Sequence, residues 1–325
     1  MQARANAKQS KGVNMKKVLL VILLVAILLM ASGCGYRPQN ANKFDADYDG
    51  NDFLSKIDDD TPLSQIALPG THDSGALRDF FIRGTARCQW MTISKQLDAG
   101  VRYMDIRLKR INGSLDVYHG PAYQGINLDD VLEQVFDFFE QNPSETLIMC
   151  IKEEGDPKGE NPELCDMLKT VIQQNPDKWF CENRIPDLGE VRGKIVLMRR
   201  FWSDTDMGFN AYYGWADNTT FTLSSGEYNL ACQDYYQDES ADKKWEAIEN
   251  FFDSMKNAQS NTYYLNNTSG YISGTFDIPN LLKICKEINP RLLQYLQDAH
   301  GIKGIVACDH ITREICCKII NLNFN

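Results

Sequence analysis

The feature of this chain that most constrains its fold is the alternation of two hydrophobic patterns. Apolar runs of strand length recur between stretches in which apolar residues have helical spacing. Such alternation is typical of βα units around a parallel sheet. Eight runs qualify as strands: Ser64–Leu68, Val101–Leu108, Leu115–Tyr118, Thr146–Lys152, Lys194–Arg200, Asn229–Gln233, Thr262–Leu265 and Gly304–Asp309. Eight strands with intervening helices predict an α/β fold with a single, somewhat irregular (β/α)8 barrel of the TIM type.

Amphipathic helices are expected between these strands. The clearest cover Leu128–Glu140, Pro162–Gln174, Lys243–Met255 and Pro279–Ala299. In the first of them, Leu128, Val131 and Val135 lie on one apolar face. We expect Asn289-Pro290 to interrupt the last helix, because the residue before a proline is disfavoured in the helical conformation.

The N-terminal region has the pattern of an export signal. Two lysines precede an apolar run, Val18–Ala31, and small residues then lead to Cys34. This run is shorter than the roughly 20 residues that span a membrane. Its ending resembles the lipobox of bacterial lipoproteins, which implies that Cys34 is a lipid anchor at the outer face of the membrane; plain secretion and a retained anchor remain alternatives. We expect a leader and signal over residues 1–34, a polar tether over 35–54 and the barrel over 55–325.

Charge and cysteine usage exclude some classes of partner. The formal net charge of −10 and the pI near 5.0 argue against binding to nucleic acid or a general attraction to anionic membranes. Any lipid contact must therefore use apolar side chains. The cysteines have no paired spacing of the kind that holds a metal, and several lie in apolar runs, so we expect buried free thiols.

Polar and charged residues gather at the ends of the expected strands, where a barrel enzyme carries its active site. They include two of the four histidines, His72 and His119, which suggest an acid/base pair. The other two, His300 and His310, are expected to be structural. The strand-end set comprises His72, Asp73, Asp105, Arg107, His119, Lys152, Glu153, Arg199, Arg200, Asp234, Tyr236, Asn266, Asp309 and His310.

Several of these residues lie in segments that resemble bacterial phosphatidylinositol-specific phospholipase C, the X-domain family. The resemblance covers about residues 55 to 320 and implies an irregular version of the same barrel. The segments that carry it are Leu68–Gly75, Gln96–Arg107, Val117–Pro121, Asn142–Lys152, Gly193–Arg200, Gln233–Tyr236 and Ala307–Ile311.

The resemblance implies cleavage of phosphatidylinositol to inositol 1,2-cyclic phosphate and diacylglycerol, by attack of the inositol 2-hydroxyl on phosphorus. It assigns His72 as general base, held by Asp309, and His119 as general acid, held by Asp73. Arg107 replaces a carboxylate that helps to bind calcium in animal relatives, so no metal or other cofactor is expected. Asp105 and Glu153 are expected to pair with Arg107 or Lys152 rather than with a cation.

By the same resemblance, the inositol head group is bound by Lys152, Arg200 and Asp234, with Tyr236 beneath the sugar ring. The alternation of side chains along a strand predicts that Arg199 points away from the barrel interior. The expected partner is phosphatidylinositol in a membrane, or a glycosylated anchor built on it, and the protein is expected to be a monomer. Peripheral membrane contact is expected from rim aromatics in Leu77–Ile82 and in the segment from Phe201 to Trp215, and packing of some of them in the core is the alternative.

Two other functions compete with this interpretation. One is a metal-dependent glycerophosphodiester phosphodiesterase on the same barrel, which Arg107 and Gln233–Tyr236 disfavour. The other is a non-catalytic lipid- or inositol-binding lipoprotein. That alternative predicts loss of at least one of His72, Arg107, His119 or Asp309, and all of them are present.

Overall fold

One curled, mostly parallel sheet organises the computed structural model, which describes residues 50–155, 160–237, 240–273 and 279–324. Eight neighbouring strands run parallel in the order β6 (Trp179–Phe180), β7 (Ile195–Arg200), β5 (Leu147–Glu153), β2 (Tyr103–Ile111), β1 (Ala67–Thr71), β14 (Gly304–Cys308), β11 (Thr262–Asn267) and β10 (Tyr228–Gln233). β9 (Thr220–Ser225) pairs antiparallel with β10 at one end, and β8 (Phe209–Asn210) pairs with β7. The predicted TIM-like barrel is confirmed, in an irregular form.

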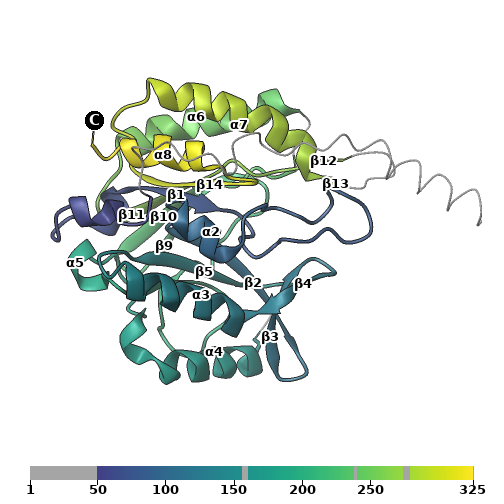
Figure 1. Ribbon diagram of the computed structural model, residues 1–325, viewed down its shortest axis with the longest axis vertical. Helices are drawn as coiled ribbons and strands as arrows, with labels where there is room; N and C mark the ends of the chain where they lie inside the picture. Colours follow the sequence, from purple (N-terminus) through teal and green to yellow (C-terminus); the bar gives the residue numbers. More distant parts are fainter. Residues whose placement is uncertain (1–49, 156–159, 238–239, 274–278, 325) are drawn as a thin grey trace, which may run out of the picture. The chain divides into compact units, whose positions relative to one another are not determined.

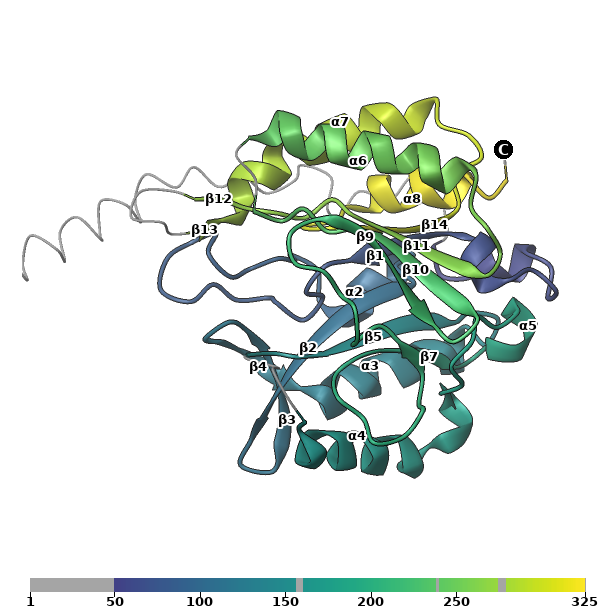
Figure 2. The ribbon, with the colours of Figure 1, turned by 180° about the vertical axis from the view of Figure 1, so that it is seen from behind.

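Helices flank the outside of this sheet on two sides (Figures 1 and 2). One group consists of α6 (Ala241–Lys256), α7 (Leu281–Gln297) and α8 (Arg313–Asn321), and on the other side of the sheet lie α3 (Leu128–Gln141) and α4 (Pro162–Gln174). The shorter helical elements are α2 (Ile93–Asp98), α5 (Leu188–Val191) and the 3-10 turns Phe53–Lys56, Leu63–Gln65 and Pro176–Lys178. β12 (Ile272–Ser273) and β13 (Pro279–Asn280) form a separate two-stranded sheet before α7.

The strands contribute alternate residues to two apolar cores. Along β5, Ile148 and Cys150 pack into the core inside the curled sheet, whereas Leu147, Met149 and Ile151 pack into the core beneath the helices. The same parity holds in β7, where Val196 and Met198 face inward. Because successive side chains of a strand point to opposite faces, this packing fixes which residue at each strand end faces the barrel interior.

The first strand lies further along the chain than predicted. Leu63–Gln65 forms a 3-10 turn, and β1 begins at Ala67 and continues through Pro69 and Gly70. Pro69 is tolerated at this position of the strand. Its carbonyl accepts from the N–H of Arg102, and the N–H that proline lacks would point to the same side of β1, just before β2 begins. A Cβ at Gly70 would lie 3.0 Å from the Tyr103 and Ile305 side chains, so any larger residue would have to push these side chains aside.

The predicted strand Leu115–Tyr118 exists, but it is not a barrel strand. As β3 (Ser114–His119) it pairs antiparallel with β2 and with β4 (Ala122–Asn127). The connection from β2 is the dipeptide Asn112-Gly113, and both residues have positive φ. Asn-Gly is the usual pair for a two-residue hairpin turn, which reverses the chain directly and leaves no room for a crossover helix. Two-residue β6 takes a place in the parallel sheet instead.

The expected interruption of the last long helix at Asn289-Pro290 is wrong. α7 is continuous from Leu281 to Gln297, with Pro290 inside it. Ile284, Ile288, Leu292 and Leu296 bury one face along its whole length. Pro290, which has no backbone N–H to donate within the helix, is exposed, so packing on the buried face outweighs the missing hydrogen bond.

The predicted signal at residues 1–34, including Cys34, lies outside the described residues. So does most of the expected tether, but its last residues, Phe53 and Leu54, are fully buried. The carbonyls of Gly50 and Asn51 accept hydrogen bonds from buried Arg102. The packed domain therefore includes residues from Gly50 onward. In the part of the chain that the structure describes, no helix has the length and apolar character to cross a bilayer.

Candidate active site

The inward faces of the parallel strands continue past the apolar core into a set of polar side chains. Adding two residues to an inward core position gives the next inward position, so Ile148 and Cys150 are followed by Lys152, and Val196 and Met198 by Arg200. The same step leads from Tyr103 to Asp105 and Arg107, and from Leu265 to Asn267. These side chains line a cavity of about 370 Å³, together with His72, His119, Trp215, Asp217, Asp234, Gly270, Tyr236, Tyr271, Leu281 and Tyr103.

His72 follows β1 and contacts two charged side chains. Its Nδ1 lies 2.9 Å from Oδ1 of buried Asp309, and its Nε2 lies 2.6 Å from Nη2 of Arg107. A guanidinium can only donate, so Nε2 accepts and the ring proton lies on Nδ1, which donates to Asp309. In this arrangement His72 is a neutral imidazole, and the lone pair of its Nε2 points to Arg107, which also lines the cavity.

Asp73 is held next to His72 by a tight turn. It has a positive φ of 41°, a conformation that Asp adopts more readily than most residues. Its N–H donates to Oδ2 of Asp105 at 3.1 Å, and the N–H of Ser74 donates to the Asp105 carbonyl at 2.8 Å. The turn between β1 and the following loop is therefore fixed to β2, the strand that carries Arg107.

His119 ends β3 and lies on the other side of Asp73. Its Nδ1 lies 2.6 Å from the Ala86 carbonyl, which can only accept, so this nitrogen carries a proton. Its Nε2 lies 3.7 Å from Asp73 Oδ2. When Nε2 is also protonated, the imidazolium therefore faces a carboxylate.

Arg107 connects the two histidines. Its Nε and Nη2 donate to Asp105 Oδ2 at 3.0 and 2.9 Å, and its Nη1 lies 3.3 Å from Asp73 Oδ2. Burial alone would raise the pKa of Asp105, but Arg107 and Arg200 outweigh it and lower that pKa. For Asp73, burial outweighs the attraction of Arg107 and His119 and raises the pKa.

Lys152 pairs with Glu154, not with Glu153. Its Nζ lies 3.2 Å from Glu154 Oε2, and Glu154 Oε1 accepts from the N–H of Gly120 at 2.7 Å, directly after His119. Glu153 has the opposite parity and accepts from Asn161. Repulsion from Arg107, followed by burial, lowers the pKa of Lys152. The expectation that Glu153 pairs with Arg107 or Lys152 is therefore wrong, because Glu154, and not Glu153, has the inward parity of Lys152.

The remaining predicted residues also line the cavity, and Arg200 lies beside Lys152 in the paired strands β7 and β5. The Arg200 guanidinium stacks on Trp215, 3.3 Å from the ring centre, and the Trp215 indole N–H donates to Asp234 Oδ2 at 2.9 Å. Asp234 Oδ1 accepts from Asn267 at 2.9 Å. Tyr236 donates to Asp217 at 2.5 Å and lies beside Tyr271. Trp215 was expected at the membrane rim, but here it supports a cation inside the cavity.

The alternation of side chains along a strand also explains why some of the predicted residues do not reach the cavity. Arg199 points away from it, as predicted, and donates to the carbonyls of Met207 and Phe201. Asn266 is buried on the outer side, where it bonds Gln233 and the Ile248 carbonyl, and its neighbour Asn267 lines the cavity instead. His310 stacks on Trp90 with neither ring nitrogen hydrogen-bonded, and burial lowers its pKa to about 4.

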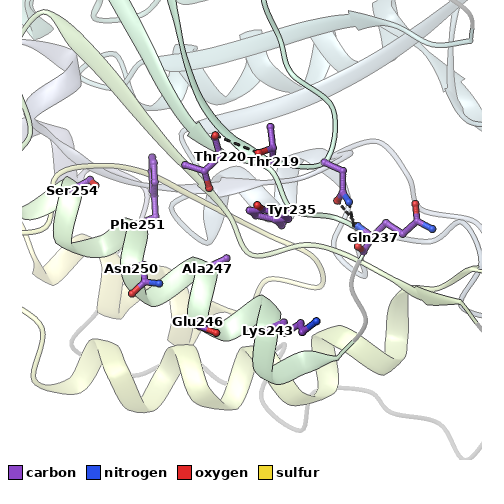
Figure 3. Close-up of a pocket in the computed structure, with 11 residues that line it drawn as sticks. Thr219, Thr220, Tyr235, Gln237, Lys243, Glu246, Ala247, Asn250, Phe251 and Ser254 are labelled. Atoms are coloured by element: carbon purple, nitrogen blue, oxygen red, sulfur yellow. Dashed lines mark hydrogen bonds between the residues drawn. The ribbon is translucent and has the colours of Figure 1, made fainter.

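A second cavity, of about 620 Å³, lies between α6 and the β9–β10 hairpin (Figure 3). Lys243, Glu246 and Asn250 of α6 line one side of it, and Thr219, Thr220 and Tyr235 line the other. It contains neither histidine and none of the predicted binding residues. We therefore place the candidate active site in the smaller cavity at the strand ends.

We expect Glu154→Gln to destabilise the protein in a pH-dependent way. Burial opposes ionisation of Glu154, but Arg107 and Lys152 outweigh it and lower its pKa from 4.5 to about 2 in the folded protein. Its stabilising contribution is therefore fully present above pH 4.5 and is lost as the pH falls toward about 2. Urea unfolding should find the variant less stable by on the order of 2 kcal/mol near neutrality, with the difference shrinking below about pH 4.

Glu163→Gln provides the control for this measurement, because Glu163 is an exposed carboxylate paired with Arg110. Its effect should stay within about 0.5 kcal/mol at every pH. A Glu154→Gln difference that stays constant down to about pH 3 would contradict the electrostatic explanation.

Comparisons with known proteins identify the family of the chain. Residues 62–201 match the family model described as phosphatidylinositol-specific phospholipase C, X domain. A 1-phosphatidylinositol phosphodiesterase of Listeria monocytogenes is 31% identical over 244 residues, covering 70% of this chain and 73% of that protein. A protein of the same name from Staphylococcus aureus is 28% identical over 297 residues, covering 87% of this chain and 90% of that protein.

Solved structures of the same kind of enzyme share the fold. A phosphatidylinositol-specific phospholipase C from Staphylococcus aureus superposes with a TM-score of 0.74 at 26% identity, over 83% of this chain and 97% of that one. The enzyme from Listeria monocytogenes superposes with a TM-score of 0.68 at 25% identity, over 85% of this chain and 99% of that one. The family match, these relatives and the shared barrel establish that the chain belongs to the bacterial phosphatidylinositol-specific phospholipase C X-domain family.

Proposed function

We propose that this protein cleaves phosphatidylinositol to inositol 1,2-cyclic phosphate and diacylglycerol without a metal ion. The observation that carries the proposal is the position of Arg107 between two histidines. Nη2 of Arg107 lies 2.6 Å from His72 Nε2, and Nη1 lies 3.3 Å from Asp73 Oδ2. The same Asp73 oxygen lies 3.7 Å from His119 Nε2. One phosphate bound to this guanidinium would have an imidazole on each side.

His72 is the proposed general base. Asp309 fixes the ring proton on Nδ1 and stabilises the imidazolium that forms when Nε2 takes a proton. The inositol 2-hydroxyl would replace the Arg107 contact at Nε2, and its oxygen would then attack phosphorus. Gln89 supports this geometry, because its amide donates to the backbone carbonyls of His72 and Cys308.

His119 is the proposed general acid toward the glycerol oxygen that leaves. The Ala86 carbonyl orients the ring through Nδ1, and Asp73 favours a proton on Nε2. Donation of that proton releases diacylglycerol. His72 then releases the proton that it took from the 2-hydroxyl, and His119 takes one up from solvent, so that both rings return to their starting states.

Arg107 supplies the charge that the phosphate requires. A guanidinium binds phosphate oxygens through two parallel N–H groups and stays charged at every working pH. Lys152 adds a second positive charge at the same side of the cavity. With these two cations in place, the proposed reaction needs no calcium ion.

Selection of the inositol head group is assigned to the wall formed by Arg200, Asp234 and Tyr236. Arg200 and Asp234 are both oriented by Trp215, and Asn267 holds the second oxygen of Asp234. Hydrogen-bonding groups fixed in this way can match ring hydroxyls. A choline or ethanolamine head group would leave them unpaired, which is costly in a buried site.

The first test of the proposed reaction uses phosphatidylinositol vesicles in the presence of EDTA. Phosphorus NMR should detect inositol cyclic phosphate as the product. His72→Ala and His119→Ala should each lower turnover by about 10²- to 10⁴-fold, because each removes one proton-transfer group. His300→Ala, which alters an exposed histidine outside the cavity, should change turnover less than about twofold.

Each alternative function predicts a different result in the same assay. Loss of turnover in EDTA would favour a metal-dependent phosphodiesterase. Absence of turnover in the wild type, with intact binding of inositol phosphates, would favour a non-catalytic binding protein.

We also propose that the loop around Phe80 and Phe81 contacts the membrane. Asp79 accepts hydrogen bonds from the N–H groups of Gly84 and Arg87 at 2.9 and 3.1 Å, which closes the loop and leaves its tip outside. At that tip Phe81 is 79% exposed and Phe80 is 47% exposed. The loop adjoins the cavity, because the Gly84 carbonyl accepts from the N–H of Leu281, a lining residue.

The second aromatic segment contributes less to such a surface than expected. Phe201 and Phe209 are fully buried in the two cores, and Met207 is almost completely buried. Only Tyr213, with 58% exposure, remains as a strongly exposed aromatic in that segment. Membrane docking is therefore assigned mainly to residues 80–82.

Substituting Phe80 and Phe81 by Ser should lower activity on vesicles by at least about tenfold, because two aromatic rings no longer enter the interfacial layer. Activity on a soluble inositol phosphodiester should stay within about twofold. Phe324→Ser, at an aromatic with 47% exposure near the carboxyl terminus, is the matched control and should affect neither assay. Equal loss on both substrates in the Phe80/Phe81 variant would reject the docking role.

Export and lipidation at Cys34 complete the proposal. If residues 15–34 act as a lipoprotein signal, expression in a bacterial host with a labelled fatty acid should label the wild type. Cys34→Ser should abolish labelling, and Cys317→Ser, at a partly exposed cysteine of α8, should not. Recovery of unlabelled wild-type protein from the medium would instead indicate plain secretion.

A further inference from the structure

Cys88 is a fully buried thiol that lies between the two histidine–carboxylate pairs. The mechanism proposed above gives it no role. Two groups of side chains in the described residues have donor atoms close enough to hold a metal ion, and both include Cys88. One group adds Asp73 and His119, and the other adds His72 and Asp309. Within each group the donor atoms lie within 4.8 Å of one another.

The group with Asp73 and His119 has the greater need of a cation. Asp73 is completely buried, and neither of its carboxylate oxygens accepts a hydrogen bond. Its nearest cationic groups are Arg107 at 3.3 Å and His119 at 3.7 Å. In the other group, His72 and Asp309 already satisfy each other at 2.9 Å, so a metal ion there would replace a good hydrogen bond.

We propose that Cys88, Asp73 and His119 form an inhibitory Zn²⁺ site. Zn²⁺ combines thiolate, imidazole and carboxylate ligands at about 2.0 to 2.3 Å in a tetrahedron, which separates neighbouring ligand atoms by about 3.3 to 3.6 Å. The Cys88 Sγ is 3.9 Å from His119 Nδ1, and His119 Nε2 is 3.7 Å from Asp73 Oδ2. A small rotation of the imidazole would bring one of its nitrogens to the metal.

The surroundings fit such a site. His119 lines the open cavity, so an ion can reach the group by the path proposed for the phosphate. Arg107 can release Asp73, because its Nε and Nη2 keep their bonds to Asp105. A water molecule from the cavity can fill the fourth ligand position. Binding displaces the thiol proton of Cys88, and any proton on the ligating ring nitrogen, to solvent.

Inhibition follows from the role of His119, and this part rests on the proposed function. A metal-bound imidazole cannot become an imidazolium, whichever nitrogen binds, so His119 can no longer protonate the leaving oxygen. The ion would also neutralise Asp73, which favours that proton. Zn²⁺ should therefore stop turnover, and a chelator should restore it.

Binding is measured directly on the full chain, by calorimetric titration with Zn²⁺ and by the thiolate-to-cobalt charge-transfer absorption that Co²⁺ produces. The wild type should bind one ion per chain and show the absorption band. Cys88→Ser and His119→Ala should each weaken binding by at least about tenfold and abolish or displace the band. Two controls should bind within about twofold of the wild type. They are His72→Ala and Cys165→Ser, a buried cysteine that contacts Ser203 and Asp204 instead.

Turnover provides the second readout. In EDTA, Cys88→Ser should cleave phosphatidylinositol within about threefold of the wild-type rate, which also shows that it folds. Zn²⁺ at a concentration that inhibits the wild type tenfold should inhibit Cys88→Ser less than about twofold. Cys88→Ala should behave like Cys88→Ser, and a thermal melt of both variants separates loss of the site from loss of the fold.

Unchanged Zn²⁺ affinity in Cys88→Ser would overturn the proposal, and so would loss of binding in His72→Ala with retention in His119→Ala. Failure of the proposed function gives a different result. In that case the wild type would not cleave phosphatidylinositol in EDTA, while calorimetry and the cobalt spectrum would still show whether Cys88, Asp73 and His119 bind the ion.

Discussion

The alternation of side chains along parallel strands is the constraint on which the site depends. Each strand must bury its apolar residues in two separate cores, inside the curled sheet and beneath the helices. That requirement fixes the register, and the register then determines which polar residue at each strand end faces the cavity. A one-residue slip in β7 would exchange Arg200 for Arg199, which now binds backbone carbonyls away from the cavity. Packing in the core thus specifies the chemistry at the strand ends.

Buried charge is the second constraint, since the site places several carboxylates and cations in one partly enclosed cavity. Arg107 contacts Asp105, Asp73 and His72, and Lys152 contacts Glu154. Burial raises the cost of each charge, and the opposite charges beside it compensate for that cost. Removing one partner therefore leaves another charge uncompensated. For this reason a substitution here affects the protonation of neighbouring groups as well as binding.

Much of this arrangement could be predicted from the sequence, because hydrophobic periodicity reports burial. The parallel strands β5, β7, β10 and β14 begin and end close to their predicted bounds, and the strand ends contain the residues that line the cavity. The β3 hairpin differs from the predicted barrel strand because the count of apolar runs takes no account of the Asn112-Gly113 turn, which joins β3 antiparallel to β2. Glu154 and Asn267 lie two residues beyond the inward positions Lys152 and Leu265, so they follow from the alternation once it is known which face of each strand is inward. Trp215 differs, because its position depends on how the segment after β7 folds back over Arg200, and that has no signature in nearby residues.

On the proposed mechanism, substrate binding would itself activate the general base. In the free protein, Arg107 occupies the Nε2 lone pair of His72 and balances Asp73 and Asp105. A bound phosphate brings a negative charge that competes for the same N–H groups, while Asp105 can keep its bonds to Nε and Nη2. When the Nη2 N–H that faces His72 donates to the phosphate instead, Nε2 of His72 becomes free to accept from the inositol 2-hydroxyl. The base is thus unblocked only when a phosphate is present, which links recognition of the phosphodiester to the first proton transfer.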